Sequence, residues 1–377
     1  MLDELMDSRG APAGSRPRFR LLAVLALKLM FSILLTVVLL ETATRLVAPE
    51  ERFELIPNTF DPVCGIRHVS NARGFVRCPE YCMEFRTNSG GLRADGDIPY
   101  ENHLGRRRIL CLGDSFTCGM GVHGHETFSA LLDSAGGAET EVLNAGVCAW
   151  GTAEQLAWYE LEGRRYHPDV VVLAHVVNDW CDNTKGGLFT LASDGSLVQH
   201  AAVEGRTLRW MRCLRRLPGY GSWFAGSHAL NRFRQWFAVR HHGRLEQAAA
   251  GDADPVALWE HERDLGEALL LKLREVCERD GAKLLIMPVP AQPGAAAAER
   301  HQEELFSFLS LRDFDLLDLR PEYADRQAAG QQLYYPVDGH WTAAGHRLAA
   351  GRLGDLMRNE VFRTGSLDAP DDARHLQ

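Results

Sequence analysis

Arg108-Ile-Leu-Cys-Leu-Gly-Asp-Ser-Phe-Thr-Cys-Gly119 is the stretch of the sequence that decides the fold. Residues 109–112 are apolar without alternation, which is typical of a strand buried on both faces of a parallel sheet, and the segment after Gly113 is compatible with a helix. Asp114 and Ser115 would then follow the carboxyl end of a strand. Open α/β sheets bind ligands at that edge, and the first N–H groups of the next helix can stabilise a developing oxyanion.

Three later stretches place polar residues where strands should end or a helix should begin: Asn144-Ala-Gly146, Asn178-Asp179 and Asp338-Gly-His340-Trp-Thr. The last of these supplies a carboxylate and an imidazole two positions apart. A serine hydroxyl is a poor nucleophile at neutral pH unless a base accepts its proton and a third group fixes the tautomer of that base. Asp338 and His340 can perform both tasks for Ser115.

The order of these blocks resembles that of the SGNH, or GDSL-like, hydrolase superfamily, in which four blocks meet at one end of a flavodoxin-like sheet. The resemblance spans residues 107–356, and the short Asp-x-His-Trp spacing is similar to that of a membrane-associated branch that includes proteins which O-acetylate exopolysaccharides such as alginate. It implies these roles: Ser115 as nucleophile, His340 as base, Asp338 as its orienting carboxylate, and Ser115, Gly146 and Asn178 as oxyanion donors. One position departs from the family pattern, because Val176 stands where a glycine is expected.

Other residues near these blocks have expected supporting roles. Asp114 should be a turn or cap residue, and Asp179 should orient the loop that carries the asparagine block. Three tryptophans closely follow the glycine, asparagine and histidine blocks and are candidates for lining a groove in which sugar rings stack: Trp150, Trp180 and Trp341. The alternative is that each of them packs beneath its own loop.

From residue 107 onward, apolar runs alternate with amphipathic segments. The expected strands are 109–112, 141–143, 170–174, 284–288 and 314–317, and the expected helices are 127–133, 152–163, 255–280 and 342–358. This alternation predicts a flavodoxin-like, doubly wound parallel sheet, an α/β fold in which repeated crossovers bring the ends of consecutive strands to one edge. Residues 189–198 interrupt the rhythm with a Ser-Asp-Gly turn between apolar arms, which predicts a β-hairpin.

The N-terminus has the pattern of an uncleaved signal anchor. Arg16, Arg18 and Arg20 precede residues 21–40, which are apolar except for Lys28 and small hydroxyl residues, and which are long enough for one membrane span. Lys28 is near the arginine end and can snorkel to that interface. The positive-inside rule places the arginines in the cytoplasm, so the catalytic domain is expected to be periplasmic or extracellular. A buried helix of a soluble protein would show polar residues at helical spacing, and this run shows almost none.

The sequence divides into these expected parts: a cytoplasmic N-terminus 1–20, a transmembrane signal anchor 21–40, a linker or adapter 41–106, a catalytic domain 107–360 with an insertion 182–254, and a tail 361–377. The adapter holds three of the nine cysteines, Cys64, Cys78 and Cys82, two of which could pair in an oxidising compartment, although the spacing assigns no connectivity. Residues 205–245 contain nine arginines, no acid and many aromatic side chains. Such a segment can contact an anionic membrane or glycan, or it can form amphipathic helices that cap the sheet.

Composition narrows the possible partners of this 377-residue chain. It is 46% hydrophobic and 24% charged with a net charge of −9, which suits one large or two ordinary globular domains. Nothing in the sequence suggests a nucleic-acid partner, because the chain is mildly acidic and shows no DNA- or RNA-recognition motif.

The expected function is that of a serine esterase of SGNH type, acting on an extracytoplasmic acylated carbohydrate or small ester. The alternative is an O-acyltransferase that moves acetyl groups onto a cell-surface polysaccharide, with an acyl-donor membrane protein as a possible partner. A second alternative is a non-catalytic carbohydrate-binding or scaffold protein on the same fold. The serine chemistry requires no metal and no organic cofactor.

Overall fold

A computed structural model of the chain describes residues 16–47, 56, 58–78, 80–204, 209, 213, 227–230, 232–233, 255–292 and 296–358. The chain divides into two compact units. One comprises Met1–Arg52 with Pro218–Gln247, and the other comprises Phe53–Leu217 with Ala248–Gln377.

The first unit is built on α1 (Arg16–Val47), a helix of 32 residues. Its part Leu21–Val47 has a mean hydropathy of 2.6 in its most apolar window, and that window is not buried against protein, so the helix is long and apolar enough to cross a membrane. The helix continues beyond the predicted end at residue 40. Within this unit the Glu41 carboxylate accepts hydrogen bonds from Ser227 Oγ at 2.8 Å and His228 N at 3.0 Å.

The second unit is organised around a sheet of five parallel strands: β5 (Arg107–Gly113), β6 (Thr140–Asn144), β7 (Val170–His175), β10 (Lys283–Pro288) and β11 (Asp315–Leu316). Their spatial order is β11-β10-β7-β5-β6, and all neighbouring pairs are parallel. The order places the first strand between the second and the third. The predicted α/β fold with a flavodoxin-like parallel sheet is therefore confirmed.

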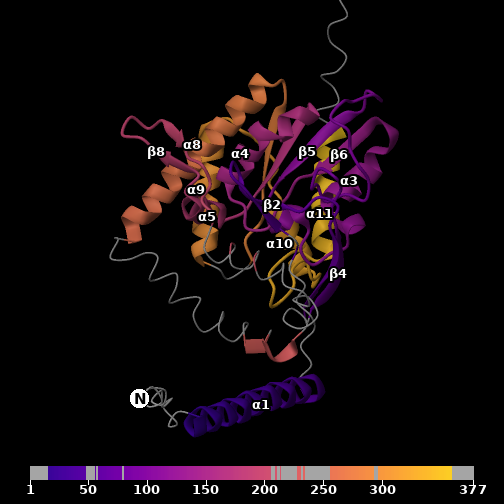
Figure 1. Cartoon of the computed structure of the whole chain (residues 1–377). Helices are drawn as coiled ribbons and strands as arrows, with labels where there is room; N and C mark the ends of the chain where they lie inside the picture. The colour runs from indigo at the N-terminus through magenta and orange to yellow at the C-terminus, as the bar shows by residue number, and fades with distance from the viewer. Residues whose placement is uncertain are drawn as a thin grey trace, which may run out of the picture. The chain divides into compact units, whose positions relative to one another are not determined.

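Helices cover both faces of this sheet (Figure 1). One face packs against α3 (Phe128–Gly136), α10 (Arg320–Ala328) and α11 (Ala343–Leu356), and the other against α4 (Thr152–Leu161), α8 (Pro255–Arg279) and α9 (Ala296–Leu311). Side chains of β5 point alternately to the two faces. Leu110 and Leu112 pack on the face covered by α4, α8 and α9, whereas Ile109 and Cys111 pack on the face covered by α3, α10 and α11. The unbroken apolar run of β5 results from this burial on both faces.

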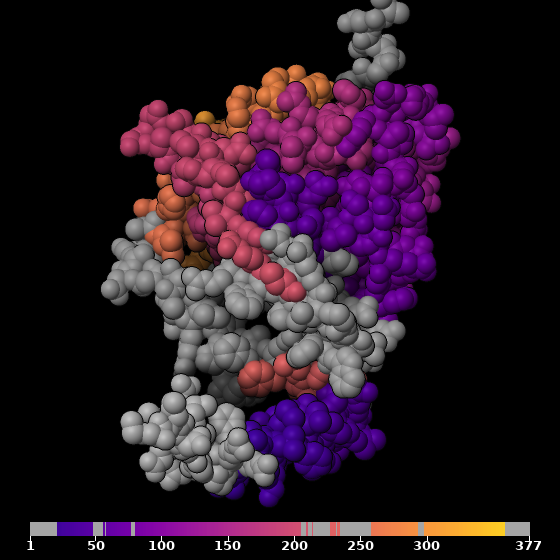
Figure 2. Space-filling view, in the orientation of Figure 1, coloured from indigo at the N-terminus to yellow at the C-terminus, as the bar shows by residue number. Residues whose placement is uncertain are grey.

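Three hairpins accompany the sheet: β1 (Asn58–Asp61) with β2 (Gly65–His68), β3 (Arg73–Cys78) with β4 (Tyr81–Arg86), and β8 (Phe189–Leu191) with β9 (Leu197–Gln199). The last is the hairpin predicted at residues 189–198. Figure 2 shows the violet β1–β2 hairpin beside the pink segment that follows β9, where Ala202 N donates to Pro62 O at 2.9 Å. The described part of the adapter, residues 56–106, thus packs within the same unit as the sheet.

Buried Arg108 ties the end of the adapter to β5. Its side chain is 1% exposed, and Nε donates to Glu141 Oε2 at 2.7 Å on the neighbouring strand. The Nη atoms donate to four backbone carbonyls, those of Pro99 at 2.8 Å, Tyr100 at 2.5 Å, Tyr166 at 2.8 Å and Glu101 at 3.4 Å. These bonds satisfy a guanidinium group that would otherwise be costly to bury.

Some sequence-based expectations concern residues beyond this description. Cys64 and Cys82 are free thiols, while the side chain of Cys78 lies outside the described residues, as do most of the basic aromatic segment 205–245 and the tail after residue 358.

Candidate active site

Ser115 is the first residue of α2 (Ser115–Cys118), a short helix that follows β5 directly. Between strand and helix, Gly113 has φ +150°, and a Cβ atom there would come within 2.2 Å of Thr117 Oγ1, so only glycine permits this sharp turn. Asp114 caps the helix, with Oδ1 accepting from Phe116 N at 2.9 Å. Asp114 is therefore the cap residue that the sequence suggested, and it leaves the serine at the edge of the sheet.

His340 lies in a tight loop between α10 and α11. Tyr335 N donates to His340 O at 2.9 Å, Gly339 N donates to Tyr335 O at 3.0 Å, and Gly339 has the left-handed φ of +86°. The loop turns the side chains of Asp338 and His340 toward one another, with Nδ1 2.5 Å from Asp338 Oδ1. On its other side, His340 Nε2 lies 2.7 Å from Ser115 Oγ.

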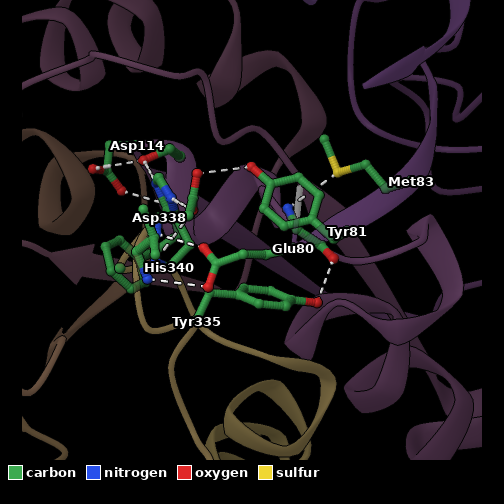
Figure 3. A network of polar contacts seen from close by, with 12 residues as sticks. Glu80, Tyr81, Met83, Asp114, Tyr335, Asp338 and His340 are labelled. Carbon is green, nitrogen blue, oxygen red and sulfur yellow. Dashed lines mark hydrogen bonds and ion pairs between the residues drawn. The ribbon is translucent and has the colours of Figure 1, made fainter. Parts of the chain in front are cut away.

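The carboxylate, imidazole and hydroxyl groups thus form a continuous chain of hydrogen bonds. Figure 3 shows Asp338 and His340 side by side in this chain. With Nδ1–H donating to the carboxylate, Nε2 presents its lone pair to the serine proton. Burial works to raise the pKa of Asp338, but the hydrogen bonds from His340 and Tyr81 outweigh it and the pKa is lowered. Asp338 is therefore ionised at neutral pH and can stabilise a protonated imidazole.

Asp114 is a second carboxyl group near the nucleophile. Its Oδ2 lies 3.3 Å from Ser115 Oγ, which is longer than the contact between the serine and the histidine. Burial raises the pKa of Asp114 to about 6. Its direct hydrogen bonds are to the backbone and to the serine, which fits a cap rather than an orienting partner for the imidazole.

Gly146 and Asn178, the expected oxyanion donors other than Ser115, follow β6 and β7, the two strands on either side of β5. In this structure both donate hydrogen bonds to other groups of the protein. Gly146 N donates to Asn144 Oδ1 at 3.1 Å, and Asn178 Nδ2 donates to Asp182 Oδ2 at 2.6 Å. Gly146 approaches α2 so closely that a Cβ atom would lie 2.2 Å from Cys118 N. An oxyanion at Ser115 would thus have to compete for the Gly146 N–H, while the amide of Asn178 retains a second hydrogen to donate.

Asp179 lies behind the asparagine block, at the start of α5 (Asp179–Gly186). It is fully buried, and its Oδ2 accepts from Val176 N at 3.1 Å, which closes the loop between β7 and α5. Burial raises the pKa of this carboxyl well above its usual range. This geometry is what a loop-orienting residue requires.

The three tryptophans correct an expectation, because none of them lines an open groove. They are 1%, 2% and 0% exposed for Trp150, Trp180 and Trp341 respectively. Trp150 Nε1 donates to Ile66 O at 2.5 Å, and Trp341 packs edge-on against Phe116 at 5.3 Å. Each ring sits in the core beneath its loop, so its faces are covered by protein and cannot stack on a sugar.

Arg93 and His68 support the site from the adapter. Arg93 donates to the backbone carbonyls of Cys118, Gly119 and Val122, so it holds the end of α2. His68 is 2% exposed, and its Nε2 lies 3.2 Å from Gly146 O, which steadies the glycine block from behind.

Sequence reasoning missed His68, and it also missed Glu80 and Tyr81, which contact the loop of Asp338. These residues belong to short strands and turns without a motif.

Comparisons with known proteins show what this chain is similar to. Residues 260–372 match a family model described as SGNH hydrolase-like domain, acetyltransferase AlgX, and a search of curated proteins found no match. Among solved structures, the psychrotrophic esterase EstA from Pseudoalteromonas sp. is 13% identical, covering 68% of this chain and 99% of that chain with a TM-score of 0.39. A lipolytic G-D-S-L protein from Veillonella parvula is 12% identical, with 67% and 99% covered and a TM-score of 0.37. The acetyl xylan esterase AlAXEase is 14% identical, with 66% and 98% covered and a TM-score of 0.39. The part of the chain that carries Asp338 and His340 is thus similar to an SGNH hydrolase-like domain of AlgX type, and this match covers residues 260–372 only.

Proposed function

We propose that the protein is a membrane-anchored serine esterase of SGNH type that removes short acyl groups from an extracytoplasmic carbohydrate or small ester. The observation that carries this proposal is the chain of hydrogen bonds from Asp338 through His340 to Ser115, with links of 2.5 and 2.7 Å. A serine with a purely structural role does not require a histidine partner whose other ring nitrogen is hydrogen-bonded to a carboxylate.

The first half of the reaction acylates the enzyme. Ser115 Oγ attacks the ester carbonyl carbon while His340 Nε2 accepts the hydroxyl proton, and the Ser115 N–H, Gly146 N–H and Asn178 amide stabilise the oxyanion. The tetrahedral intermediate collapses with cleavage of the bond to the alcohol oxygen, which leaves with the proton from His340. The acyl group remains as an ester on Ser115.

The second half reverses these roles. An acceptor hydroxyl gives its proton to His340 and attacks the acyl-Ser115 carbonyl, and the released Ser115 Oγ regains the proton from His340. Water as the acceptor gives hydrolysis, whereas a sugar hydroxyl gives transfer. The catalytic residues are the same in both reactions, so the occupant of the acceptor position decides between them.

Exposure of the catalytic side chains favours a short acyl group on a large alcohol. The side chains of His340 and Asp338 are 22% and 24% exposed, so the reacting atoms lie at the protein surface rather than in a deep apolar cavity. A long acyl chain would require such a cavity to bury its methylene groups. An acetyl group on a polysaccharide fits a shallow site better.

Transfer of an acetyl group to a polysaccharide is the second candidate function. The matched family model, which is described as that of an acetyltransferase, supports it. An acyl-donor membrane protein would then be a partner, because the acetyl group must reach Ser115 from an activated ester.

The apolar part of α1 supports anchoring in a membrane. We propose that the arginines before it stay in the cytoplasm and that the unit with Ser115 is extracytoplasmic, where surface polysaccharides are found.

Mass spectrometry of the trapped acyl-enzyme tests these proposals. The full-length protein in detergent micelles is incubated briefly with an aryl acetate and digested, and an acetyl adduct is expected on the peptide that carries Ser115. Ser115→Ala is the matched control and should give no adduct. Addition of an oligosaccharide should produce acetylated sugar if transfer occurs and only free acetate if the enzyme is an esterase. A wild-type chain without adduct and without turnover would indicate the non-catalytic scaffold.

A further inference from the structure

We propose that Glu80 and Tyr81, at the turn of the β3–β4 hairpin, are positioning residues that fix Asp338 in the orientation required by His340. The inference rests on the proposed function. It gives the adapter segment, which precedes the SGNH blocks, a role in positioning the catalytic residues. Figure 3 shows both side chains reaching from the hairpin to the loop of Asp338 and His340.

Glu80 holds the backbone of this loop. Its Oε1 accepts from Val337 N at 3.0 Å and its Oε2 accepts from Asp338 N at 2.6 Å. One carboxylate thus binds two consecutive N–H groups, and such charge-assisted bonds are about twice as strong as neutral ones. The peptide that carries Asp338 is thereby fixed in both position and direction.

Tyr81 holds the side chain of the same residue. Its hydroxyl donates to Asp338 Oδ2 at 2.9 Å, while Asp338 Oδ1 is engaged by His340 Nδ1. Because the two oxygens are held from different directions, the carboxylate cannot rotate about its last side-chain bond without breaking a hydrogen bond. The plane of the carboxylate therefore stays aligned with the imidazole.

The hairpin is itself fastened to the segment that follows the nucleophile. The rings of Tyr81 and Tyr335 pack at 4.9 Å, and Tyr335 Oη donates to Gly121 O at 2.9 Å. Gly121 N in turn donates to Met83 Sδ at 3.1 Å, on the strand that carries Tyr81. The hairpin, the base loop and the segment after α2 are therefore cross-linked around the site.

The loop needs such support because its own contacts are few on the solvent side. Val337 is 89% exposed, and Gly339 adopts a left-handed conformation so that Asp338 can face His340 across a single intervening residue. Exposed loops of this kind open at low free-energy cost unless other elements hold them. Glu80 and Tyr81 supply that restraint from a segment more than 250 positions away, since their bonds to Asp338 span 258 and 257 residues.

The two side chains should also shift the pH dependence of the reaction in opposite directions. The titratable groups that interact with His340 are Asp338 on its own loop, Asp114 before α2 and His346 on α11, and Glu80 on the hairpin lies behind Asp338. Tyr81→Phe removes a donor from Asp338 and leaves more negative charge facing the imidazole, which favours its protonated form. Glu80→Gln removes a negative charge and disfavours that form.

The test measures kcat and KM for an aryl acetate across the acidic and neutral range with full-length protein in detergent micelles. For Tyr81→Phe and for Glu80→Gln we expect kcat to fall about 10-fold, as for loss of one charge-assisted hydrogen bond, with KM almost unchanged. The midpoint of the acidic limb of kcat/KM should move to higher pH in Tyr81→Phe and to lower pH in Glu80→Gln. Two matched controls, Tyr100→Phe and Glu84→Gln, should retain the wild-type profile, because their hydrogen bonds go to Glu162 and to Arg73.

A double-mutant cycle separates positioning from a structural effect. In an Asp338→Asn background, Tyr81→Phe should cause little further loss, because a residue that acts through Asp338 cannot act without its carboxylate. Unchanged melting temperatures would show that the variants fold. Wild-type rates and pH midpoints in both hairpin variants, or an undiminished loss in the Asp338→Asn background, would overturn the inference. Turnover that survives Ser115→Ala would instead overturn the proposed function, so the two failures are distinguishable.

Discussion

Ser115 Oγ lies 2.7 Å from His340 Nε2 although 225 positions separate the two residues. The sheet makes this contact possible. β5 is a central strand, so its carboxyl end lies between the ends of β6 and β7, and the loop before α11 reaches the same edge. The candidate catalytic groups are thus carried by separate elements and meet only when the sheet is complete.

Removal of Ser115 and His340 should have non-additive effects. Ser115→Ala and His340→Ala should each lower kcat for an aryl acetate by about 10⁴-fold or more, and the double variant should be no worse, because both groups act in the same proton transfer. Stopped-flow or steady-state release of the phenol measures the loss. Circular dichroism of each variant checks that it is folded.

A different base would be revealed by one outcome of that experiment. If His340→Ala kept near-native turnover while Ser115→Ala did not, another histidine would have to serve. His123 and His125 are stacked on each other at 5.7 Å, and His123 Nδ1 accepts from Glu84 N at 3.3 Å. We therefore expect His123→Ala to retain turnover.

Asn178 offers a test of the oxyanion site. Asn178→Ala should lower kcat by roughly 10²–10³ with little change in stability, because the amide is exposed and its loss affects the transition state. Its current partner provides a matched variant. Asp182→Asn weakens the 2.6 Å bond that holds the amide, so kcat should stay within the same order of magnitude or rise. A larger loss in Asp182→Asn than in Asn178→Ala would argue against this role.

The sequence predicted the sheet well because its strands are buried on both faces. Residues 109–112, 141–143 and 170–174 all lie within observed strands. A short apolar run that ends in a turn is typical of a strand buried on both faces of a parallel sheet. The helices α5, α9 and α10 were missed. α5 and α10 are short and mostly polar, so they contain few apolar residues from which a helical period could be recognised. α9 was missed although Leu305, Phe308 and Leu309 follow helical spacing.

The candidate site was predictable only where a motif carried it. The positions of Ser115, Asp338 and His340 followed from short blocks of residue types that the chemistry requires. Contacts between distant segments had no such signal, as with Glu80 and Asp338. The burial of Trp341 could not be predicted from the sequence either, because an aromatic residue beside a candidate catalytic histidine can line a groove or fill a core. The packing of Phe116 against Trp341 in the structure shows that it fills the core.

Membrane topology can be measured with reporters. With the arginines before α1 in the cytoplasm, an alkaline phosphatase fused after Gln377 should be active in a bacterial host, and a β-galactosidase fused there should not. Removal of residues 1–47 should release the remainder from the membrane fraction. Active β-galactosidase in the first experiment would contradict the extracytoplasmic proposal.

Arg108 should be a strong contributor to folding stability. Arg108→Ala leaves the Glu141 carboxylate and four carbonyls without this donor, and we expect the free energy of unfolding to fall by about 3–5 kcal/mol. Denaturant midpoints followed by tryptophan fluorescence measure the change. Arg164→Ala is the control, since its 3.2 Å pair with Asp280 is 44% exposed on the arginine side and should contribute about 0–1 kcal/mol.

Glu154 should make folding stability fall as pH rises. This residue is 8% exposed in the first turn of α4, where Oε2 accepts from Gly151 N at 3.0 Å, and burial raises its pKa from 4.5 to about 7. Between these two values the folded state binds a proton that the unfolded state has lost. The free energy of unfolding therefore declines as pH rises from 4.5 to about 7 and no longer changes above pH 7 through this group. The total decline is at most roughly 3 kcal/mol.

Glu154→Gln removes this titration and keeps an oxygen for the Gly151 N–H. We expect the variant to match the wild type near pH 4.5, where the wild-type carboxyl is protonated in the folded state, and to melt at a higher temperature above pH 7. Carboxyls that do not interact with Glu154 titrate in both proteins and cancel in the difference, whereas the pKa of Asp179 is raised in part by the Glu154 charge and should be lower in the variant. Thermal melts at matched pH values measure that difference. A variant that is equally destabilised at both ends of the range would show that the loss of packing, rather than the buried charge, dominates at this position.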